Sequence, residues 1–320
     1  TYGEIEGSSR LRDNICGLYE NQKRDNIVVT HGAIGANALV HETMISPGDH
    51  VISICPTYQQ HYSIPESFGA KLDILWLRPE NDFLPDLEEL GRMLRPNTKL
   101  VVLNNPNNPT GALLMGANLE EFVAVVRTSG AYILCDEVYR GTNQVGNGFA
   151  PGMADIYEKG ISVSSMSKVF SLAGIRLGWI AAPREVLEAV SIRRDYNTIS
   201  VGMIDDYFAS LALENKEQII GRSQKITRGN LKILDDWVSK EDSISYKKPQ
   251  AGTTALLKYD FDIPSREFCI QLLRETGVMF TPGSVMEMEG WLRIGYANSP
   301  EVLSQGLDLV SNFLLQMGSR

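Results

Sequence analysis

The feature of this sequence that most constrains its fold is an alternation of short apolar runs with stretches of helical periodicity. The apolar runs occupy residues 27–30, 51–54, 72–77, 99–103, 131–135 and 161–163, and helical patterns lie between several of them, for example at 86–94. Short, continuously apolar runs are typical of strands that are buried on both faces. Because strands that alternate with helices form parallel sheets with helices on both sides, the pattern predicts an α/β fold.

The later part of the chain has a different pattern. Helices are predicted at 185–196, 203–213 and 216–240, followed by strands at 255–259 and 291–296 and a helix at 265–276. A last helix begins after Ser299, with Pro300 at its first position, where proline is favoured. No repeat or low-complexity linker interrupts the sequence, so the domain boundary is placed beside the long helix. We expect a large domain over 8–225 and a smaller α+β domain over 226–320.

The composition is that of an ordinary globular protein, and the chain is long enough for two domains. The chain has 320 residues, of which 43% are hydrophobic and 22% charged, and its net charge is −9. A negative balance argues against nucleic acid or an anionic membrane as a partner. No apolar run approaches the length needed to span a bilayer, so we expect no membrane association.

Cysteine, histidine and the amino terminus give three further expectations. Four well-separated cysteines without a CxxC pair predict reduced thiols in a cytoplasmic protein: Cys16, Cys55, Cys135 and Cys269. The histidines lack metal-binding spacing, so we expect no metal site: His31, His41, His50 and His61. The sequence begins without Met and with a turn-like segment that is neither a signal nor a transit peptide. We therefore expect residues 1–7 to be the remnant of a truncated amino-terminal segment.

The segment 161–179 contains the most distinctive chemistry. An apolar run ends in Ser165 and Lys168, and Arg176 follows eight residues after the lysine, before a second apolar run at 177–182. A lysine amine becomes a nucleophile when its pKa is lowered or when it is held as an imine. A guanidinium fork and a serine hydroxyl suit the oxygens of a phosphate. Together these groups suit a carbonyl cofactor that carries a phosphate, pyridoxal 5′-phosphate; the alternative is a surface lysine after a strand.

Polar or aromatic residues also follow the other predicted strands. Residues 31–37 form a glycine-containing turn into a helix, which is either a plain turn or an anion site. Tyr58 could stack on a ring or fill the core, and Asn108 could serve a ligand or simply a turn. Asp136, at the end of an apolar strand, needs a positive partner such as a protonated pyridine nitrogen. Tyr139 could then reach the other side of that ring.

These residues occur in an order that resembles the class I/II aminotransferases, which are fold-type I pyridoxal-phosphate enzymes. Asn-Asn-Pro-Thr-Gly at 107–111 precedes Asp-Glu-Val-Tyr at 136–139, which is followed by Ser-Met-Ser-Lys at 165–168 and by Arg176. The resemblance spans nearly the whole chain. It implies a three-layer sandwich around a mostly parallel seven-stranded sheet, together with a smaller α+β carboxy-terminal domain.

The resemblance also implies a specific role for each of these residues. Lys168 is expected to form the internal aldimine with pyridoxal phosphate and to move the proton between Cα and C4′. Asp136 is expected to keep the pyridine nitrogen protonated. Tyr139 and Asn108 are expected to hydrogen-bond the ring oxygen O3′, and Tyr58 to stack on the ring. The implied reaction transfers an amino group from an α-amino acid to a 2-oxo acid.

Further implied contacts concern the phosphate, the substrate and a second subunit. The phosphate is expected to bind Arg176, Ser165 and the backbone amides of Gly32, Ala33 and Ile34. Tyr2 corresponds to a tyrosine that reaches the neighbouring subunit's phosphate, so a homodimer with shared sites is expected. Arg293 alternates with apolar residues in a strand, and the sequence alone slightly favours a surface position for it. The resemblance instead implies that Arg293 binds the substrate α-carboxylate, with Asn108 beside it.

Several differences from the usual pattern of the family leave the reaction and the substrate open. Asp205 and Asp206 stand where relatives more often have Gln or small residues, and Gln-Ala-Gly-Thr-Thr at 250–254 replaces a Gly-Gly-aromatic stretch. Arg193 and Arg194 could bind a second substrate carboxylate, but a solvated helix end is the favoured interpretation of both. The alternatives to transamination are β-elimination or cyclisation of an amino acid on the same fold. A non-enzymatic sensor module is a third alternative, which the acidic charge and the lack of a DNA-binding domain disfavour.

Overall fold

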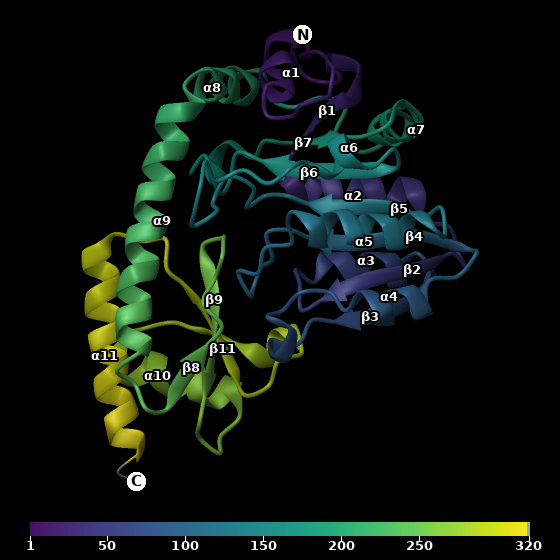
Figure 1. The fold of residues 1–320 in the computed structure, drawn as a ribbon. Helices are drawn as coiled ribbons and strands as arrows, with labels where there is room; N and C mark the ends of the chain where they lie inside the picture. The colour runs from purple at the N-terminus through teal and green to yellow at the C-terminus, as the bar shows by residue number, and fades with distance from the viewer. Residues whose placement is uncertain (319–320) are drawn as a thin grey trace.

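A computed structural model describes residues 1–318 and contains two β-sheets surrounded by helices (Figure 1). The larger sheet has seven strands in the order β1-β7-β6-β5-β4-β2-β3. Its strands are β1 (Ile27–Thr30), β2 (His50–Cys55), β3 (Lys71–Trp76), β4 (Thr98–Asn104), β5 (Tyr132–Asp136), β6 (Gly160–Ser165) and β7 (Gly178–Ala181). The predicted mostly parallel seven-stranded sheet is therefore confirmed.

One strand of this sheet, β7, runs against its neighbours. It pairs antiparallel with both β6 and β1, whereas β2, β3, β4, β5 and β6 pair in parallel. Parallel neighbours need a long crossover connection, usually a helix. Between β6 and β7 the chain forms only a short 3-10 turn, Ala173–Ile175, so it returns beside β6 in the opposite direction. The segment that contains Lys168 is this return.

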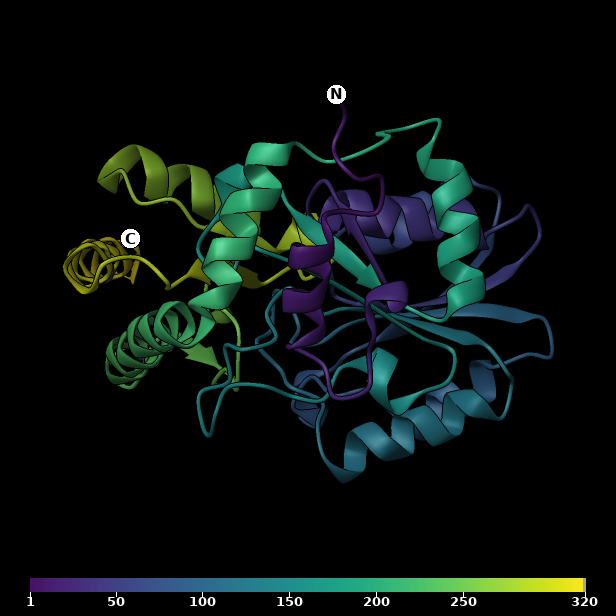
Figure 2. The ribbon, with the colours of Figure 1, turned by 90° about the horizontal axis from the view of Figure 1, so that it is seen from above.

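Helices cover both faces of the large sheet (Figure 2). On β4, Val102 belongs to the core shared with α2 (Gly32–Met44) and α7 (Arg184–Arg194), whereas Val101 belongs to the core shared with α4 (Leu87–Met93) and α5 (Ala117–Arg127). Successive strand residues point to opposite faces, so continuously apolar strands supply both cores. Two further helices, α3 (Gln60–Ser67) and α6 (Met153–Ile156), also belong to this part of the chain.

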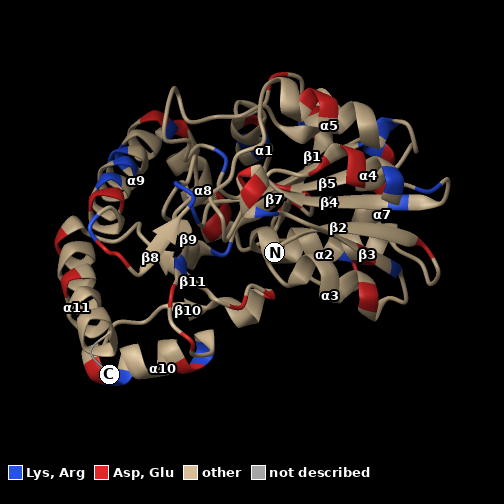
Figure 3. Ribbon diagram, turned by 60° about the horizontal axis from the view of Figure 1, so that its bottom comes forward, with Lys and Arg blue, Asp and Glu red and all other residues tan. Residues whose placement is uncertain are grey.

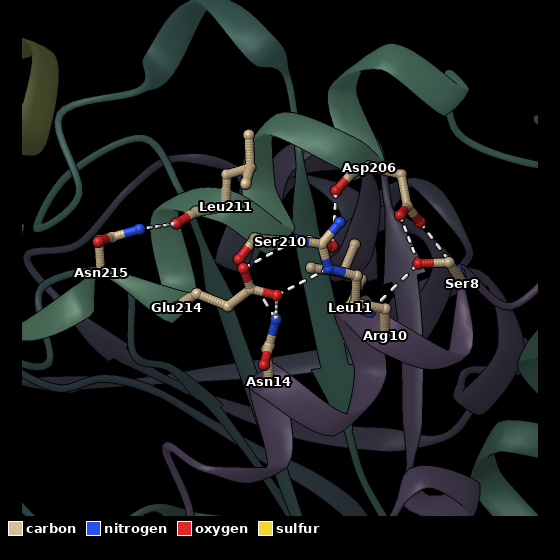
Figure 4. A network of polar contacts seen from close by, with 9 residues as sticks. All are labelled: Ser8, Arg10, Leu11, Asn14, Asp206, Ser210, Leu211, Glu214 and Asn215. Carbon is tan, nitrogen blue, oxygen red and sulfur yellow. Dashed lines mark hydrogen bonds and ion pairs between the residues drawn. The ribbon is translucent and has the colours of Figure 1, made fainter.

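The amino-terminal helix is attached to the outside of this unit through polar contacts with α8 (Met203–Glu214) (Figure 4). Ser8 caps α1 (Ser9–Cys16) by accepting a hydrogen bond from the Leu11 amide, at 3.1 Å. Asp206 accepts hydrogen bonds from both the backbone amide and the hydroxyl of Ser8. Arg10 forms a bidentate pair with Glu214, with both N–O distances at 2.7 Å. Asp206, one of the unusual acids of the sequence, therefore has a structural partner.

The smaller sheet has four strands in the order β10-β11-β9-β8. Its strands are β8 (Ile244–Tyr246), β9 (Thr254–Tyr259), β10 (Thr281–Pro282) and β11 (Trp291–Gly295), and its helices are α9 (Lys216–Val238), α10 (Ser265–Thr276) and α11 (Pro300–Gly318). The α9, α10 and α11 helices share one core with this sheet. Acidic and basic residues are interspersed along outer helices such as α9 and α4 (Figure 3), as on solvated surfaces.

The predicted elements agree with this architecture except in a few places. The sequence pattern predicts a first helix over 9–20, but in the structure this helix ends at Cys16. The helices α3 and α5 lacked a clear pattern in the sequence. Pro300 begins α11, and the Ser299 hydroxyl accepts from the Val302 amide at 3.3 Å, as expected. Among the helices of residues 1–318, none combines the length and apolarity needed to cross a membrane.

Candidate active site

The polar residues that follow the large sheet's parallel strands meet at one edge and line a cavity of about 620 Å³. Parallel strands end on the same side of a sheet, which is where α/β folds bind ligands. Ten of the predicted site residues line this cavity: Ala33, Ile34, Tyr58, Asn108, Asp136, Tyr139, Ser165, Lys168, Arg176 and Arg293. Gly32 lies beside Arg176, as described below. Tyr2 lies elsewhere, on an exposed surface next to α8, where it lines a different pocket.

Asp136, at the end of β5, is held by three hydrogen bonds. The Asn37 side-chain amide donates to Oδ2 at 2.8 Å, and His61 Nε2 lies 3.2 Å from the same oxygen. The Val138 backbone amide donates to Oδ1 at 3.1 Å. Asp136 is 5% exposed. A buried carboxylate of this kind is suited to a positively charged partner inside the cavity.

Lys168 lies in the loop after β6, with its amine 5.7 Å from the centre of the Tyr139 ring. Burial lowers the pKa of this lysine, and the positive charges of Arg293 and Arg176 lower it further, while Asp136 acts in the opposite direction. A lowered pKa increases the fraction of neutral amine, which is the form that attacks a carbonyl. Lys168 is exposed, but it is exposed to the cavity, where its lowered pKa suits it to act as a nucleophile or base.

The start of α2 forms the anion-binding end of the cavity. Gly32 has φ = +66°, and a Cβ at this position would lie 2.8 Å from Arg176 Nη2, so the glycine gives the guanidinium room. The first amides of α2, including that of Ala33, carry the partial positive charge of the helix amino terminus. Ser165, at the end of β6, is buried next to this point and lines the same cavity. Backbone amides, a hydroxyl and a guanidinium together suit a phosphate.

Arg293 reaches the cavity from β11 of the smaller sheet. Its Nη1 donates to Asn108 Oδ1 at 3.3 Å, and its Nη2 donates to Thr281 Oγ1 at 3.1 Å. The surface position that the sequence alone slightly favoured is wrong, because this half-buried strand residue faces the large sheet's edge. The two neutral partners fix the fork while leaving its charge free for an anion such as a carboxylate.

Tyr139 supplies a neutral hydroxyl to the cavity. Burial and the charge of Asp136 raise the pKa of Tyr139 to about 12, although Arg293 opposes this shift. The phenol therefore keeps its proton at neutral pH and can donate a hydrogen bond to an oxygen anion. Tyr58, by contrast, is about half exposed, so its ring forms a wall of the cavity that a flat ligand could cover.

The two arginines at the end of α7 do not line the cavity. Arg193 is exposed, as predicted, but Arg194 is fully buried, so the predicted solvated position of Arg194 is wrong. None of its three guanidinium nitrogens has a hydrogen-bond partner among the described residues, and burial lowers its pKa to about 10. Sequence analysis could not anticipate this, because arginine is seldom buried without a partner.

Several cavity residues were not predicted from the sequence. They share polar, uncharged side chains and come from elements that meet only in the fold: Asn37, Gln60, Asn104, Ser167, Thr253, Thr254 and Asn298. The position of Asn37 one helical turn after Ala33 was the available signal, since it places both residues on one face of α2. His61 similarly lies one turn after Tyr58, but its partner Asp136 is 75 residues away in the sequence.

Comparisons with known proteins agree with the fold. Residues 1–308 match the family described as aminotransferase class I and II. The chain is 29% identical to capreomycidine synthase of Streptomyces vinaceus, over 98% of this chain and 80% of that protein. It is 28% identical to an aspartate aminotransferase of Thermotoga maritima, over 98% and 83% of the two chains.

Solved structures show the same similarity in three dimensions. A PLP-dependent aminotransferase from Streptococcus suis superimposes with a TM-score of 0.96 at 44% identity, over 99% of this chain and 84% of that one. A Thermus thermophilus aspartate aminotransferase variant gives 0.90 at 25% identity, over 98% and 88%. The sequence match extends over nearly the entire chain, and the chain therefore belongs to the class I and II aminotransferases.

Proposed function

We propose that this protein is a pyridoxal-phosphate-dependent aminotransferase that moves an amino group from an α-amino acid to a 2-oxo acid. The observation that carries the proposal is the position of Lys168. Its amine, with a lowered pKa, shares one cavity with the Asp136 carboxylate and the Arg293 guanidinium. The amine can react with a carbonyl cofactor, the carboxylate can bind its positive charge, and the guanidinium can bind the carboxylate of an amino acid.

The cavity residues fit pyridoxal phosphate. The space beside Gly32, which a Cβ would fill, together with Arg176 and the amino terminus of α2, suits the phosphate. The Asp136 carboxylate suits a protonated ring nitrogen, and the neutral Tyr139 hydroxyl, with its raised pKa, suits the ring oxygen. The cavity volume of about 620 Å³ lies within the range of cofactor and ligand sites.

The bound cofactor would supply a carbonyl that accepts the amino group and a ring that withdraws electrons from the substrate. Lys168 Nζ would hold the cofactor and, once released by substrate, would take the proton from the substrate Cα. Asp136 would keep a proton on the ring nitrogen, Tyr139 and Asn108 would donate hydrogen bonds to O3′, and Tyr58 would stack on the ring. Ser165, Arg176 and the amides of Gly32, Ala33 and Ile34 would bind the phosphate.

Arg293 would bind the substrate α-carboxylate. Its two hydrogen-bond partners are Asn108, in the loop after β4 of the large sheet, and Thr281, in β10 of the small sheet, so both parts of the fold orient the guanidinium. A bidentate arginine–carboxylate pair fixes the orientation of the substrate as well as binding it. The substrate Cα would then be held within reach of Lys168, which shares the cavity.

We extend the proposal to the assembly and its setting. The protein would act as a homodimer in which Tyr2 reaches the neighbouring subunit's phosphate. The exposed position of Tyr2, outside the cavity of its own subunit, supports this.

The large domain would comprise residues 8–225 and the small domain residues 226–320, and the two separate sheets support this division. The four free cysteines support a reducing, cytoplasmic location.

An absorbance titration tests the proposed reaction. The purified protein with pyridoxal phosphate should show a visible band that disappears when an amino donor is added and returns when a 2-oxo acid is added. Lys168→Ala should lose the band shift and lower kcat by at least about 10²–10⁴-fold, because the positioned base is removed. Lys159→Ala is the matched control, since this half-buried lysine precedes β6 at its other end, where its amine contacts the Gly130 carbonyl and the Tyr132 ring and does not line the cavity. Ordinary turnover by Lys168→Ala would refute the assignment.

The same titration separates a second candidate function. A relative named capreomycidine synthase, and not an aminotransferase, motivates β-elimination or cyclisation of an amino acid as the alternative. This reaction would release ammonia, a keto acid or a cyclic product without the return of the band on addition of a 2-oxo acid. A protein that shows no cofactor band at all would contradict both candidates.

A further inference from the structure

The inner face of α2 contacts the carboxylate of Asp136 through a residue that the proposed function does not use. Asn37 is 1% exposed, lines the cavity and donates its amide hydrogen to Asp136 Oδ2 at 2.8 Å. The orientation of the Asn37 amide is fixed by this contact, because the reverse orientation would place two oxygen acceptors together. His61 Nε2, from α3, lies 3.2 Å from the same carboxylate oxygen.

The His61 ring contacts the carboxylate through Nε2, and its other ring nitrogen makes no such contact. His61 Nδ1 is buried and has no hydrogen-bond partner within residues 1–318. A carboxylate oxygen only accepts hydrogen bonds, so the hydrogen of this contact belongs on Nε2. On its far side His61 meets His41, with ring centroids 6.1 Å apart, and burial lowers the pKa of His41 to about 3. His41 therefore supplies no positive charge to this region at neutral pH.

Three groups hydrogen-bond the Asp136 carboxylate in the described structure, and two of them are amides, which carry no charge: the Asn37 side chain and the Val138 backbone; the third is His61. Neutral donors orient a carboxylate without compensating its charge. A cation in the cavity can then interact with the negative charge, in a buried setting where such an interaction is strong. A positively charged side chain in place of Asn37 would instead pair with the carboxylate and weaken its attraction for a cation in the cavity.

We propose that Asn37 is a positioning residue that acts through Asp136 and sets the affinity of the site for a ring with a protonated nitrogen. The proposal rests on the function proposed above, because it assumes that a pyridine cofactor occupies the cavity. It adds that the preference of the site for a ring with a protonated nitrogen, over a ring without one, depends on α2. The first turn of the same helix forms the end of the cavity that is proposed to bind the phosphate. One helix would then align both ends of the cofactor, with the phosphate at Gly32 and the ring nitrogen at Asn37.

The test compares two probes that differ only at the ring nitrogen. Dissociation constants are measured by absorbance and fluorescence titration for pyridoxal 5′-phosphate and for its 1-deaza analogue, in which C–H replaces the nitrogen. Asn37→Leu removes the donor at similar volume and should weaken pyridoxal phosphate binding by about 10-fold, as expected for one hydrogen bond to a charged group. The affinity for the deaza analogue should change by less than about 3-fold, because this probe has no interaction with the Asp136 charge to lose.

Val40→Ala is the matched control. Val40 is a fully buried core residue of α2, and its truncation loosens the helix without touching Asp136. This variant should weaken the binding of both probes equally or of neither, so the ratio of their dissociation constants should stay unchanged. Circular dichroism should show that each variant is folded. An equal loss for both probes in Asn37→Leu, or no loss for either, would overturn the proposal. Failure of the unaltered protein to bind either probe would instead contradict the proposed cofactor.

Discussion

Two adjacent acids at the end of β5 have different surroundings because successive strand residues point to opposite faces. Asp136 faces the cavity, whereas Glu137 faces the core and is 2% exposed. Glu137 Oε1 accepts hydrogen bonds from the Met153 amide at 2.6 Å and from the Ser162 hydroxyl at 2.7 Å. Its Oε2 has no partner among the described residues. Burial raises the pKa of Glu137 from 4.5 to about 7.

This raised pKa predicts a pH-dependent contribution to stability. Between pH 4.5 and about 7 the folded state holds a proton on Glu137 that the unfolded state releases. The stabilisation is therefore complete below pH 4.5 and is lost as the pH rises through about 7. Glu137→Gln keeps the acceptor without the titration. Relative to this variant, the unaltered protein should lose on the order of 3 kcal/mol of unfolding free energy between about pH 5 and about pH 8.

Urea unfolding of both proteins at the two pH values measures this difference. The gap between them should widen at the higher pH, with the glutamine variant the more stable of the two. A gap that is the same at both pH values would show that Glu137 is already ionised in the folded protein and paired with a cation.

At the scale of secondary structure, the anion-binding end depends on the close approach of β7 to the start of α2. A Cβ at Gly178 would lie 2.5 Å from the Gly32 carbonyl carbon and 2.6 Å from the Ala33 nitrogen. Both atoms belong to the backbone, so neither can move without displacing the first turn of the helix. The antiparallel direction of β7 is what places its first residue at this edge of the sheet.

Gly178→Ala should therefore separate β7 from α2. Overpacking of this kind typically costs about 1–3 kcal/mol of stability, and the displaced amides should also weaken pyridoxal phosphate binding. Thermal unfolding and a cofactor titration measure the two effects. Gly221→Ala, on α9, is the control, because its added Cβ would meet no atom within 4 Å. Unchanged cofactor affinity in Gly178→Ala would mean that the first turn of α2 does not bind the phosphate.

The sequence allowed much of this arrangement to be predicted, for reasons that apply element by element. Continuous apolar runs revealed the strands, and polar residues at their ends, such as Asp136 and Asn108, had to meet because parallel strands end together. The direction of β7 was not readable, since an apolar strand has the same pattern in either direction. The contact of Asn37 with Asp136 joins residues 99 positions apart and depends on how α2 packs on the sheet. No local pattern contains that information.

At the scale of the whole molecule, the cavity is built from both sheets. The large sheet provides the lysine, the carboxylate and the anion-binding end, and β11 of the small sheet provides Arg293. The helix α9, about 35 Å long at 1.5 Å per residue, runs from α8 to the small sheet (Figure 1). Relative movement of the two sheets would therefore change the distance between the Arg293 guanidinium and Lys168.

The amino-terminal segment, α1, α7 and α8 lie at one end of the molecule (Figure 1), and several of these segments carry exposed apolar side chains. They belong to the amino-terminal segment, α7, the following loop and α8: Tyr2, Ile5, Ile192, Tyr196, Met203, Ile204, Tyr207 and Phe208. Tyr2, Met203 and Tyr207 line one shared pocket, so three of these side chains are neighbours. An apolar surface of this kind marks a site of association, which agrees with the proposed homodimer.

A charge placed on this surface should disrupt the dimer and, through it, the active site. Ile204 is 72% exposed on α8, so Ile204→Glu should fold normally but weaken association by at least about 10-fold, because a carboxylate would be buried at the interface. Pyridoxal phosphate affinity should fall in parallel if Tyr2 of the neighbouring subunit completes the phosphate site. Analytical ultracentrifugation and cofactor titration over a range of protein concentrations measure both. Leu309→Glu, on the exposed side of α11, should change neither. A dimer that survives Ile204→Glu with full affinity would place the interface elsewhere.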